Sequence, residues 1–174
     1  IARVALLRNP DESWAWQIIE ACIRDSDFSN QLKSFPTTAP MIFSENPQRA
    51  IKLGRLAFNL KRFDIASRFL NAVNTTSSSK EGLDLEGRAW HRQKNHKNAL
   101  ICWKKLIDKN TNVETNMDRA ARAAFNSEYY LESAEIALKL HKLRPEKNQH
   151  ILLASKAIAR EDKSPLKSTN LSEV

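Results

Sequence analysis

Glycine and cysteine are scarce in this chain: of 174 residues only 3 are glycine and 2 are cysteine, and 6 are proline. So few glycines argue against glycine-rich phosphate loops, collagen-like sequences and turn-rich all-β folds. The two cysteines, Cys22 and Cys102, are too few for a disulfide framework or a four-thiolate zinc site. We expect both to be small core residues.

Long apolar runs are also missing, since none approaches the roughly 18 residues that a membrane-spanning helix needs. The start does not resemble a signal peptide, because Arg3, Arg8 and Pro10 interrupt its short apolar stretch. Residues 1–8 have instead the pattern of the end of an amphipathic helix. We therefore expect a fragment of a larger protein, with no membrane span and a cytoplasmic location.

The composition, 41% hydrophobic and 28% charged, is typical of a folded globular protein. The formal net charge is +8, and it is concentrated in the centre of the chain. From Arg49 to Lys109 there are 14 Lys and Arg against 5 Asp and Glu, a net charge of +9. This excess favours an anionic partner.

Helix start signals recur along the chain. Asn9-Pro10 and Asn46-Pro47 pair a capping residue with a proline suited to the first helical position. Ser78 to Glu81 and Thr115 to Asp118 resemble capping boxes. Together with the apolar spacing, these signals predict an all-α chain with helices near 10–24, 47–60, 63–74, 80–93, 96–108, 115–126, 131–143 and 146–160.

The pattern repeats. Repeats that start at residues 13, 47, 80, 115 and 149 are offset by 34, 33, 35 and 34 residues. In this frame Gly54 and Gly87 share the eighth place, whereas Ala66, Ala99 and Ala134 share the twentieth. Leu70, Trp103 and Leu138 follow four residues later. The sequence here resembles the tetratricopeptide repeat (TPR) family, whose repeat has about 34 residues.

The resemblance implies a right-handed α-α solenoid of helix-turn-helix repeats, in which Gly or Ala at the helix crossing lets two backbones approach closely. Its expected segments are the end of a truncated repeat (1–12), a degenerate repeat (13–46), three TPR-like repeats (47–79, 80–114 and 115–148), a capping helix (149–163) and a flexible tail (164–174). In the degenerate repeat, Pro36 and Pro40 predict a short or irregular second helix.

No catalytic motif stands out. The histidines His91, His96, His141 and His150 lack metal-ligand spacing, and the sequence contains no phosphate loop, glycine-flanked serine or HExxH-type motif. We therefore expect no enzyme activity in this segment, and no cofactor or metal site.

In TPR arrays the first helices line a concave groove, and the resemblance assigns the second, fifth, ninth, twelfth and thirteenth places of a repeat to ligand contact. The corresponding candidates are Arg55, Phe58, Asn59, Asp84, Arg88, His91, Arg92, Arg119, Asn126 and Ser127. Arg55 and Arg88 share one place, so we expect their guanidiniums to stack along the groove. Arginine binds carboxylates and phosphates through two parallel hydrogen bonds. The alternative is a solvated basic face, whose arginines pair with Glu81, Asp84 or Glu86.

Three functions fit these observations. The first is a non-catalytic interaction module with a basic groove for an acidic peptide or partner domain. The second is a scaffold or oligomerisation domain of a larger enzyme, such as a modular bacterial transferase. The third is an RNA-binding helical repeat, which the core places of Phe58, Trp90, Trp103 and Phe125 disfavour. The chaperone-tail clamp of some TPR domains requires Lys and Asn at the fifth and ninth places. The repeat from residue 47 has Ile51 and Arg55 there, so the sequence does not support that ligand.

Overall fold

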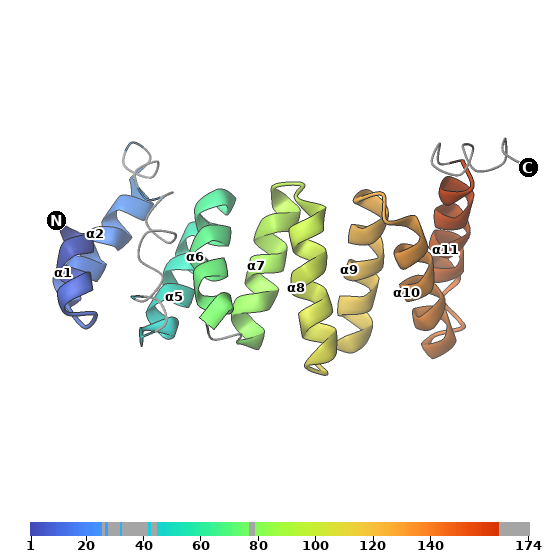
Figure 1. Cartoon of the computed structure of the whole chain (residues 1–174), viewed down its shortest axis with the longest axis horizontal. Coiled ribbons are helices and arrows are strands. Elements are labelled where there is room, and N and C mark those ends of the chain that lie inside the picture. The colour runs from blue at the N-terminus through green and yellow to red at the C-terminus, as the bar shows by residue number, and fades with distance from the viewer. Residues whose placement is uncertain (26, 28–31, 33–41, 43–44, 77–78, 164–174) are drawn as a thin grey trace, which may run out of the picture. The chain divides into compact units, whose positions relative to one another are not determined.

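The structure, a computed structural model, describes residues 1–25, 27, 32, 42, 45–76 and 79–163. Over these residues the chain is all-α, as predicted, and has no β-strand. Its helices are α1 (Ala2–Arg8), α2 (Ser13–Arg24), α5 (Pro47–Asn59), α6 (Phe63–Thr76), α7 (Lys80–Arg92), α8 (His96–Asp108), α9 (Val113–Asn126), α10 (Tyr130–Leu143) and α11 (Asn148–Glu161) (Figure 1).

The chain forms two compact parts, Ile1–Asn95 and His96–Val174, which are called here the first and the second part. The boundary lies between α7 and α8, inside the expected repeat 80–114. Each part therefore contains its own set of packed helices.

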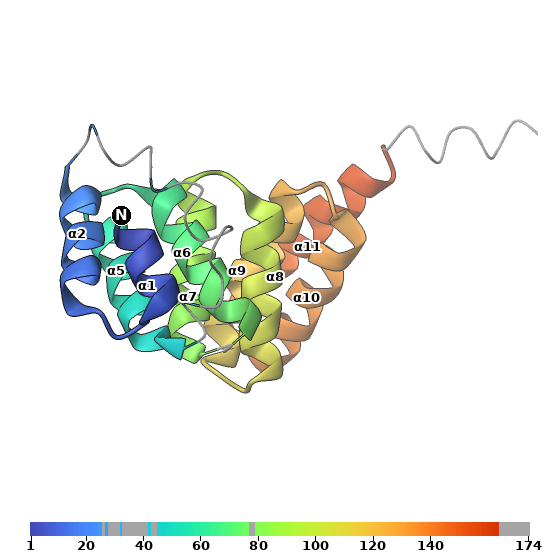
Figure 2. The ribbon, with the colours of Figure 1, turned by 60° about the vertical axis from the view of Figure 1, so that its left-hand side comes forward.

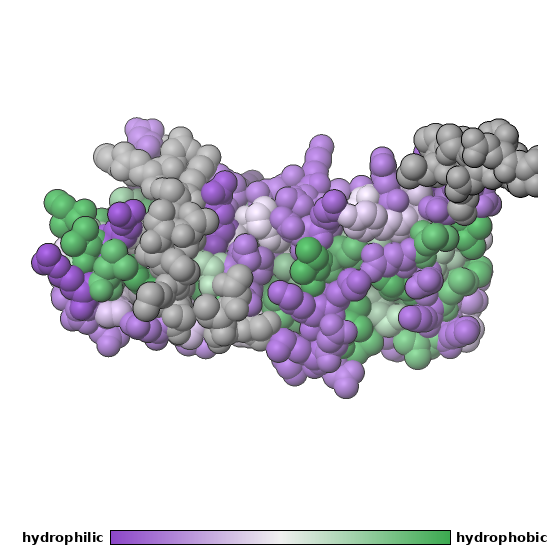
Figure 3. All heavy atoms as spheres, viewed as in Figure 1, coloured by the Kyte–Doolittle hydropathy of each residue, from purple (hydrophilic) through white to green (hydrophobic). Residues whose placement is uncertain are grey.

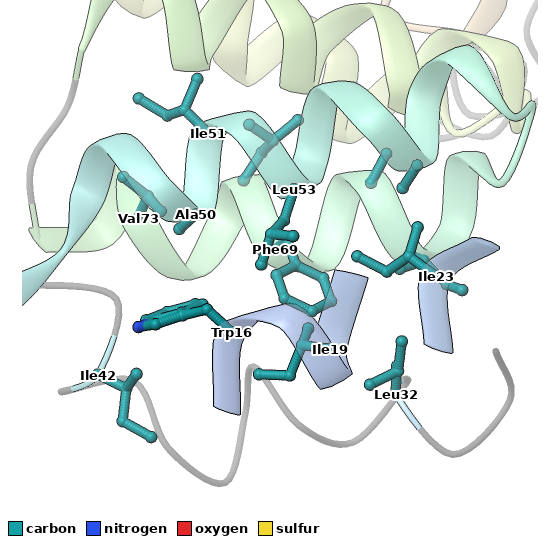
Figure 4. Packing of buried hydrophobic residues seen from close by; sticks show 14 of the residues in the cluster. Trp16, Ile19, Ile23, Leu32, Ile42, Ala50, Ile51, Leu53, Phe69 and Val73 are labelled. Atoms are coloured by element: carbon teal, nitrogen blue, oxygen red, sulfur yellow. The ribbon is translucent and has the colours of Figure 1, made fainter. Parts of the chain in front are cut away.

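In the first part, α1 packs against α2, α2 against α5, α5 against α6 and α6 against α7 (Figure 2). Helix α5 also contacts α7. The core lies between these helices, where Phe69 of α6 is fully buried next to Ile19 of α2 (Figure 4). Trp16 and Ile23 join the same cluster, so α2 is anchored by its apolar face.

In the second part, α8 packs against α9, α9 against α10 and α10 against α11, and α9 also contacts α11. Small residues fill one core cluster of this part, with Ala121, Ala134, Ala137, Ala154 and Ala157 all buried. Small side chains let helices approach closely. In both parts, contacts between consecutive helices and between every second helix are consistent with a helical repeat.

The crossing of α5 and α6 depends on Gly54. A Cβ atom at this position would lie 2.6 Å from Leu70 Cγ and 2.8 Å from Leu70 Cδ2. Leu70 is itself fully buried, so neighbouring atoms enclose its side chain. The glycine at the eighth place of this repeat thus lies against the leucine at its twenty-fourth place, with no room for a larger side chain at position 54.

The turns that follow α5, α7 and α9 share one backbone geometry. Lys61, Lys94 and Glu128 adopt left-handed conformations with φ of 60°, 60° and 65°. In each turn the next N–H donates to the carbonyl five residues back: Arg62 to Ala57 at 2.8 Å, Asn95 to Trp90 at 3.0 Å and Tyr129 to Ala124 at 2.9 Å. These bonds satisfy carbonyls at the helix end. Residue type does not predict this geometry, because none of the three left-handed residues is glycine.

The predicted helix start at Pro10 was wrong. Helix α2 begins at Ser13, and Asn9 Oδ1 instead accepts a hydrogen bond from the Asp11 N–H at 3.1 Å. In this local turn the side-chain oxygen of Asn9 is already hydrogen-bonded, so it does not cap a helix that starts at Pro10. The Pro10 carbonyl accepts hydrogen bonds from Trp16 Nε1 at 2.8 Å and from Asn46 Nδ2 at 3.1 Å, which ties the turn to α2 and to the start of α5.

The two capping boxes were also misplaced. Ser79 rather than Ser78 precedes α7, and its Oγ accepts a hydrogen bond from the Gly82 N–H at 2.9 Å. Helix α9 begins at Val113, so Thr115 lies inside it. The reason is that Asn112 turns the chain in a left-handed conformation, earlier than the Thr-x-x-Asp pattern indicates.

The remaining helices match their predicted ranges within two residues at each end. Two predictions lie outside the described residues. These are the second helix of the degenerate repeat, with Pro36 and Pro40, and the flexible tail 164–174.

Candidate functional site

The strongest candidate site lies where α5 and α7 meet. Arg55 and Phe58 are one turn apart on α5, and Asp84 and Arg88 are one turn apart on α7. Helical spacing of three or four residues places each pair on one face of its helix. The two helices contact each other, so the structure brings these four predicted residues together.

Arg88 connects the two helices through an aromatic contact. Its guanidinium carbon lies 5.0 Å from the centre of the Phe58 ring, within the range of a cation–π interaction. Phe58 in turn packs edge-on against Phe63, with ring centres 5.2 Å apart. Arg88 Nη1 also lies 3.7 Å from Asp84 Oδ2 in the same helix. The guanidinium is therefore held against an apolar platform.

Arg55 makes the second connection, an ion pair with Glu81 of α7. The Arg55 and Glu81 side chains are 54% and 52% exposed, respectively. An ion pair that is this open to water contributes about 0.2–1 kcal/mol. We call Arg55, Phe58, Glu81, Asp84 and Arg88 the α5–α7 cluster.

The arginines of the cluster thus have partners in the structure, as the alternative of a solvated basic face expected. Asp84 and Glu81 lie at the fifth and second places of the repeat from residue 80. They pair with Arg88 and Arg55, respectively, so each guanidinium has its own carboxylate. The Arg88 guanidinium has the Phe58 ring as an additional partner.

The third carboxylate of α7, that of Glu86, faces inward. Glu86 is only 5% exposed and accepts hydrogen bonds from Asn74 Nδ2 at 2.7 Å and from Trp90 Nε1 at 3.0 Å. Buried carboxylates need such donors, because leaving one without them costs several kcal/mol. Glu86 therefore ties α7 to α6, whereas Glu81 and Asp84 remain at the surface.

The other predicted residues of the first part are exposed. Asn59 ends α5, and His91 and Arg92 lie in the last turn of α7. Arg92 brings a further guanidinium to this surface. It adds to the positive charge near the end of α7.

The predicted residues of the second part lie on α9 or directly after it. Arg119 is half-buried, and its Nη1 donates to Asn116 Oδ1 at 3.5 Å. Asn126 ends α9, and Ser127 follows it. The side chain of Arg119 is thus directed to Asn116, one turn earlier on the same helix, and these three residues do not define a site of their own.

A pocket of about 200 Å³ lies between the ends of α9, α10 and α11, lined by Glu114, Thr115, Asp118, Leu140, Arg144, Lys147, Gln149 and His150. Several of its charged groups are paired with one another. Arg144 Nε donates to Glu114 Oε2 at 2.8 Å, and this hydrogen bond lowers the pKa of Glu114 and raises the pKa of Arg144.

The same pocket contains a buried histidine. The His150 side chain is 4% exposed, and its Nδ1 lies 3.7 Å from Asp118 Oδ1. Asp118 also accepts a hydrogen bond from Arg122 Nε at 2.9 Å through its other oxygen, which raises the pKa of Arg122. Arginines therefore hold both carboxylates of the pocket, Arg144 that of Glu114 and Arg122 that of Asp118.

Metal-ligating side chains do not cluster in the described part of the chain. Residues 1–25, 27, 32, 42, 45–76 and 79–163 include no group of three or more His, Cys, Asp or Glu that could hold a metal ion. None of the described helices combines the length and the apolar character that crossing a bilayer requires. The aromatic residues considered for RNA binding are buried in the case of Trp103 and half-buried in the case of Phe58, Trp90 and Phe125.

Comparisons with known proteins leave the family of the chain open. No protein-family model matches it, and neither does any curated protein sequence.

Proposed function

We propose that this chain is a non-catalytic interaction module, a TPR-like right-handed α-α solenoid whose α5–α7 cluster binds an acidic segment of a partner protein. The observation that carries the proposal is the pair of half-exposed arginines on neighbouring first helices, with Arg88 stacked on Phe58. A stacked guanidinium keeps the N–H groups at its edge available for a carboxylate. The exposed Arg92 adds to the positive field.

The TPR-like assignment is supported by the packing of the helices and by their turns. The Gly54–Leu70 contact joins the eighth and the twenty-fourth places of the repeat from residue 47. The three left-handed turns recur at the spacing of the sequence repeat. In such an array α2, α5 and α7 are consecutive first helices, and the contacts α2–α5 and α5–α7 agree with that role. A groove along first helices is a common surface for extended or helical peptides.

The test is a titration with an acidic peptide. The probe is a capped, alanine-rich peptide of about 16 residues, long enough to form some helix, that carries Glu and Asp on one face. Arg55→Ala combined with Arg88→Ala should weaken binding at least tenfold, or by about 1.4 kcal/mol. Binding of the parent protein should also weaken as salt rises.

The matched control is Arg24→Ala combined with Arg122→Ala. Like Arg88, these arginines pair with carboxylates one turn away on their own helices, Glu20 and Asp118, but they lie outside the α5–α7 cluster. The control therefore removes the same charge and two exposed ion pairs, both of the intrahelical kind that Arg88 forms. Equal affinities of the parent, the Arg55/Arg88 variant and the control would refute the proposal.

A second candidate function, an assembly contact within a larger enzyme or an oligomer, is favoured by the apolar surface of the second part. Leu131 and Leu143 of α10 are each 56% exposed, and Leu152 of α11 is 57% exposed. Apolar side chains gather over these two helices on the face shown in Figure 3. Large exposed apolar patches often mark protein contacts.

Sedimentation over a range of protein concentrations tests this second function. Self-association through these helices would raise the sedimentation coefficient with concentration, and Leu131→Ser with Leu152→Ser would abolish that rise. A parent chain that stays monomeric over the whole concentration range would refute self-association through these helices.

A further inference from the structure

The α5–α7 cluster already contains carboxylates in the positions that an acidic ligand would take. Glu81 pairs with Arg55, and Asp84 pairs with Arg88. Both acids lie on α7, three residues apart, and both pairs are open to water. The cluster thus presents two arginines whose present partners are spaced as i and i+3 on a helix.

Resting on the proposed function, we infer that Glu81 and Asp84 are internal competitors of the ligand, which is a helical acidic segment with two carboxylates three residues apart. On binding, the carboxylates of the ligand replace Glu81 at Arg55 and Asp84 at Arg88. Side chains at i and i+3 have Cβ atoms about 5–6 Å apart on a helix. The ligand therefore reproduces the spacing that the two arginines already accommodate.

Separating the carboxylate from its partner requires little free energy at these two pairs, but much more at Glu86. Each surface pair is about half-exposed, so Glu81 and Asp84 can release their arginines and be hydrated instead. Glu86 is buried and holds two hydrogen bonds, so it stays in place while the surface acids move. The Phe58 ring keeps the Arg88 guanidinium in position during the exchange, because the aromatic contact does not involve a carboxylate.

This mechanism predicts that removing a competitor strengthens binding. In Glu81→Gln and in Asp84→Asn, the corresponding arginine keeps only a neutral amide oxygen as its partner, which a carboxylate of the ligand displaces more easily. Each variant should therefore bind the probe about two- to fivefold more tightly. Glu20→Gln is the matched control, because it removes a negative charge from another surface pair of the first part, that with Arg24. At physiological salt its effect on the cluster should be screened.

The spacing is tested with two helical probes of identical composition and about 16 residues. One carries Glu and Asp at i and i+3, and the other carries them at i and i+2, where they point to different helix faces. The parent protein should bind the first probe at least about fivefold more tightly, and the difference should vanish in Arg55→Ala with Arg88→Ala. Affinities are measured by fluorescence anisotropy, and circular dichroism verifies that each variant is folded.

The outcomes separate the inference from the proposed function. If both probes bind equally, or if neither Glu81→Gln nor Asp84→Asn strengthens binding beyond Glu20→Gln, the competitor mechanism is wrong while acidic-ligand binding stands. If neither probe binds the parent or the two neutralised variants, both ideas are wrong. Tighter binding of the i, i+3 probe together with gains at Glu81 and Asp84 supports both.

Discussion

Gly54→Ala tests the close helix crossing in the first part, because the substitution changes the free energy of unfolding in two opposite ways. In a helix interior, alanine is more favourable than glycine by about 1 kcal/mol. The new Cβ, however, would lie 2.6 Å from Leu70 Cγ, a branch point rather than the end of a flexible chain. Overpacking in a filled core costs about 1–3 kcal/mol. The expected net result is a loss of about 1 kcal/mol of unfolding free energy.

Urea denaturation followed by circular dichroism measures this loss, and a second variant identifies its cause. Leu70→Ala alone should cost about 2–5 kcal/mol, because it leaves a cavity. When both substitutions are combined, the methyl group added at position 54 enters that cavity, so the double variant should be more stable than the sum of the single effects. If Gly54→Ala is as stable as propensity alone requires, about 1 kcal/mol above the parent, the crossing is looser than the structure shows.

Two further predictions concern the turns and a surface ion pair. Lys94→Gly should raise the free energy of unfolding by about 0.5 kcal/mol, because glycine adopts the left-handed conformation at φ 60° without steric strain, although it also increases the conformational entropy of the unfolded chain. A loss of stability in urea denaturation would refute this. Glu114 has its pKa lowered from 4.5 by Arg144, so its ion pair stabilises the fold above that pH and is lost as the pH falls. Between about pH 6 and pH 3 the melting temperature of the parent should therefore fall further than that of Glu114→Gln, with Glu135→Gln as control; equal falls would contradict the pairing.

The helices could be predicted from the sequence because their apolar spacing and the 34-residue repeat reinforce each other. Gly54 and Leu70 stand at the eighth and twenty-fourth places of that repeat, and their contact is a detail that the repeat pattern did not predict. The helix starts were less predictable. Asn9 and Thr115 have side chains that suit several local turns, so the local pattern alone does not select one of them. At Pro10, the carbonyl is held by Trp16 and Asn46, which no local pattern indicates.

The candidate site was predictable in part. The repeat frame placed Arg55, Phe58 and Arg88 on neighbouring first helices, and their contacts in the structure agree with it. The frame could not predict which carboxylate each arginine selects, because that choice depends on side-chain rotamers across two helices. The sequence indicated Glu81, a member of the cluster, only as a partner of the arginines in a solvated basic face. Its position at the second place of its repeat was the available signal.

The most direct test of the central proposal is an NMR titration that observes the side-chain Nε–H groups of the arginines as the i, i+3 acidic probe is added. The resonances of Arg55 and Arg88 should shift together with a single saturating curve, because a carboxylate hydrogen bond changes the environment of the guanidinium. Arg24 and Arg122, which pair with acids outside the α5–α7 cluster, should not move. Saturable shifts at Arg24 and Arg122 without shifts at Arg55 and Arg88, or no shifts at any of the four, would contradict binding at the α5–α7 cluster.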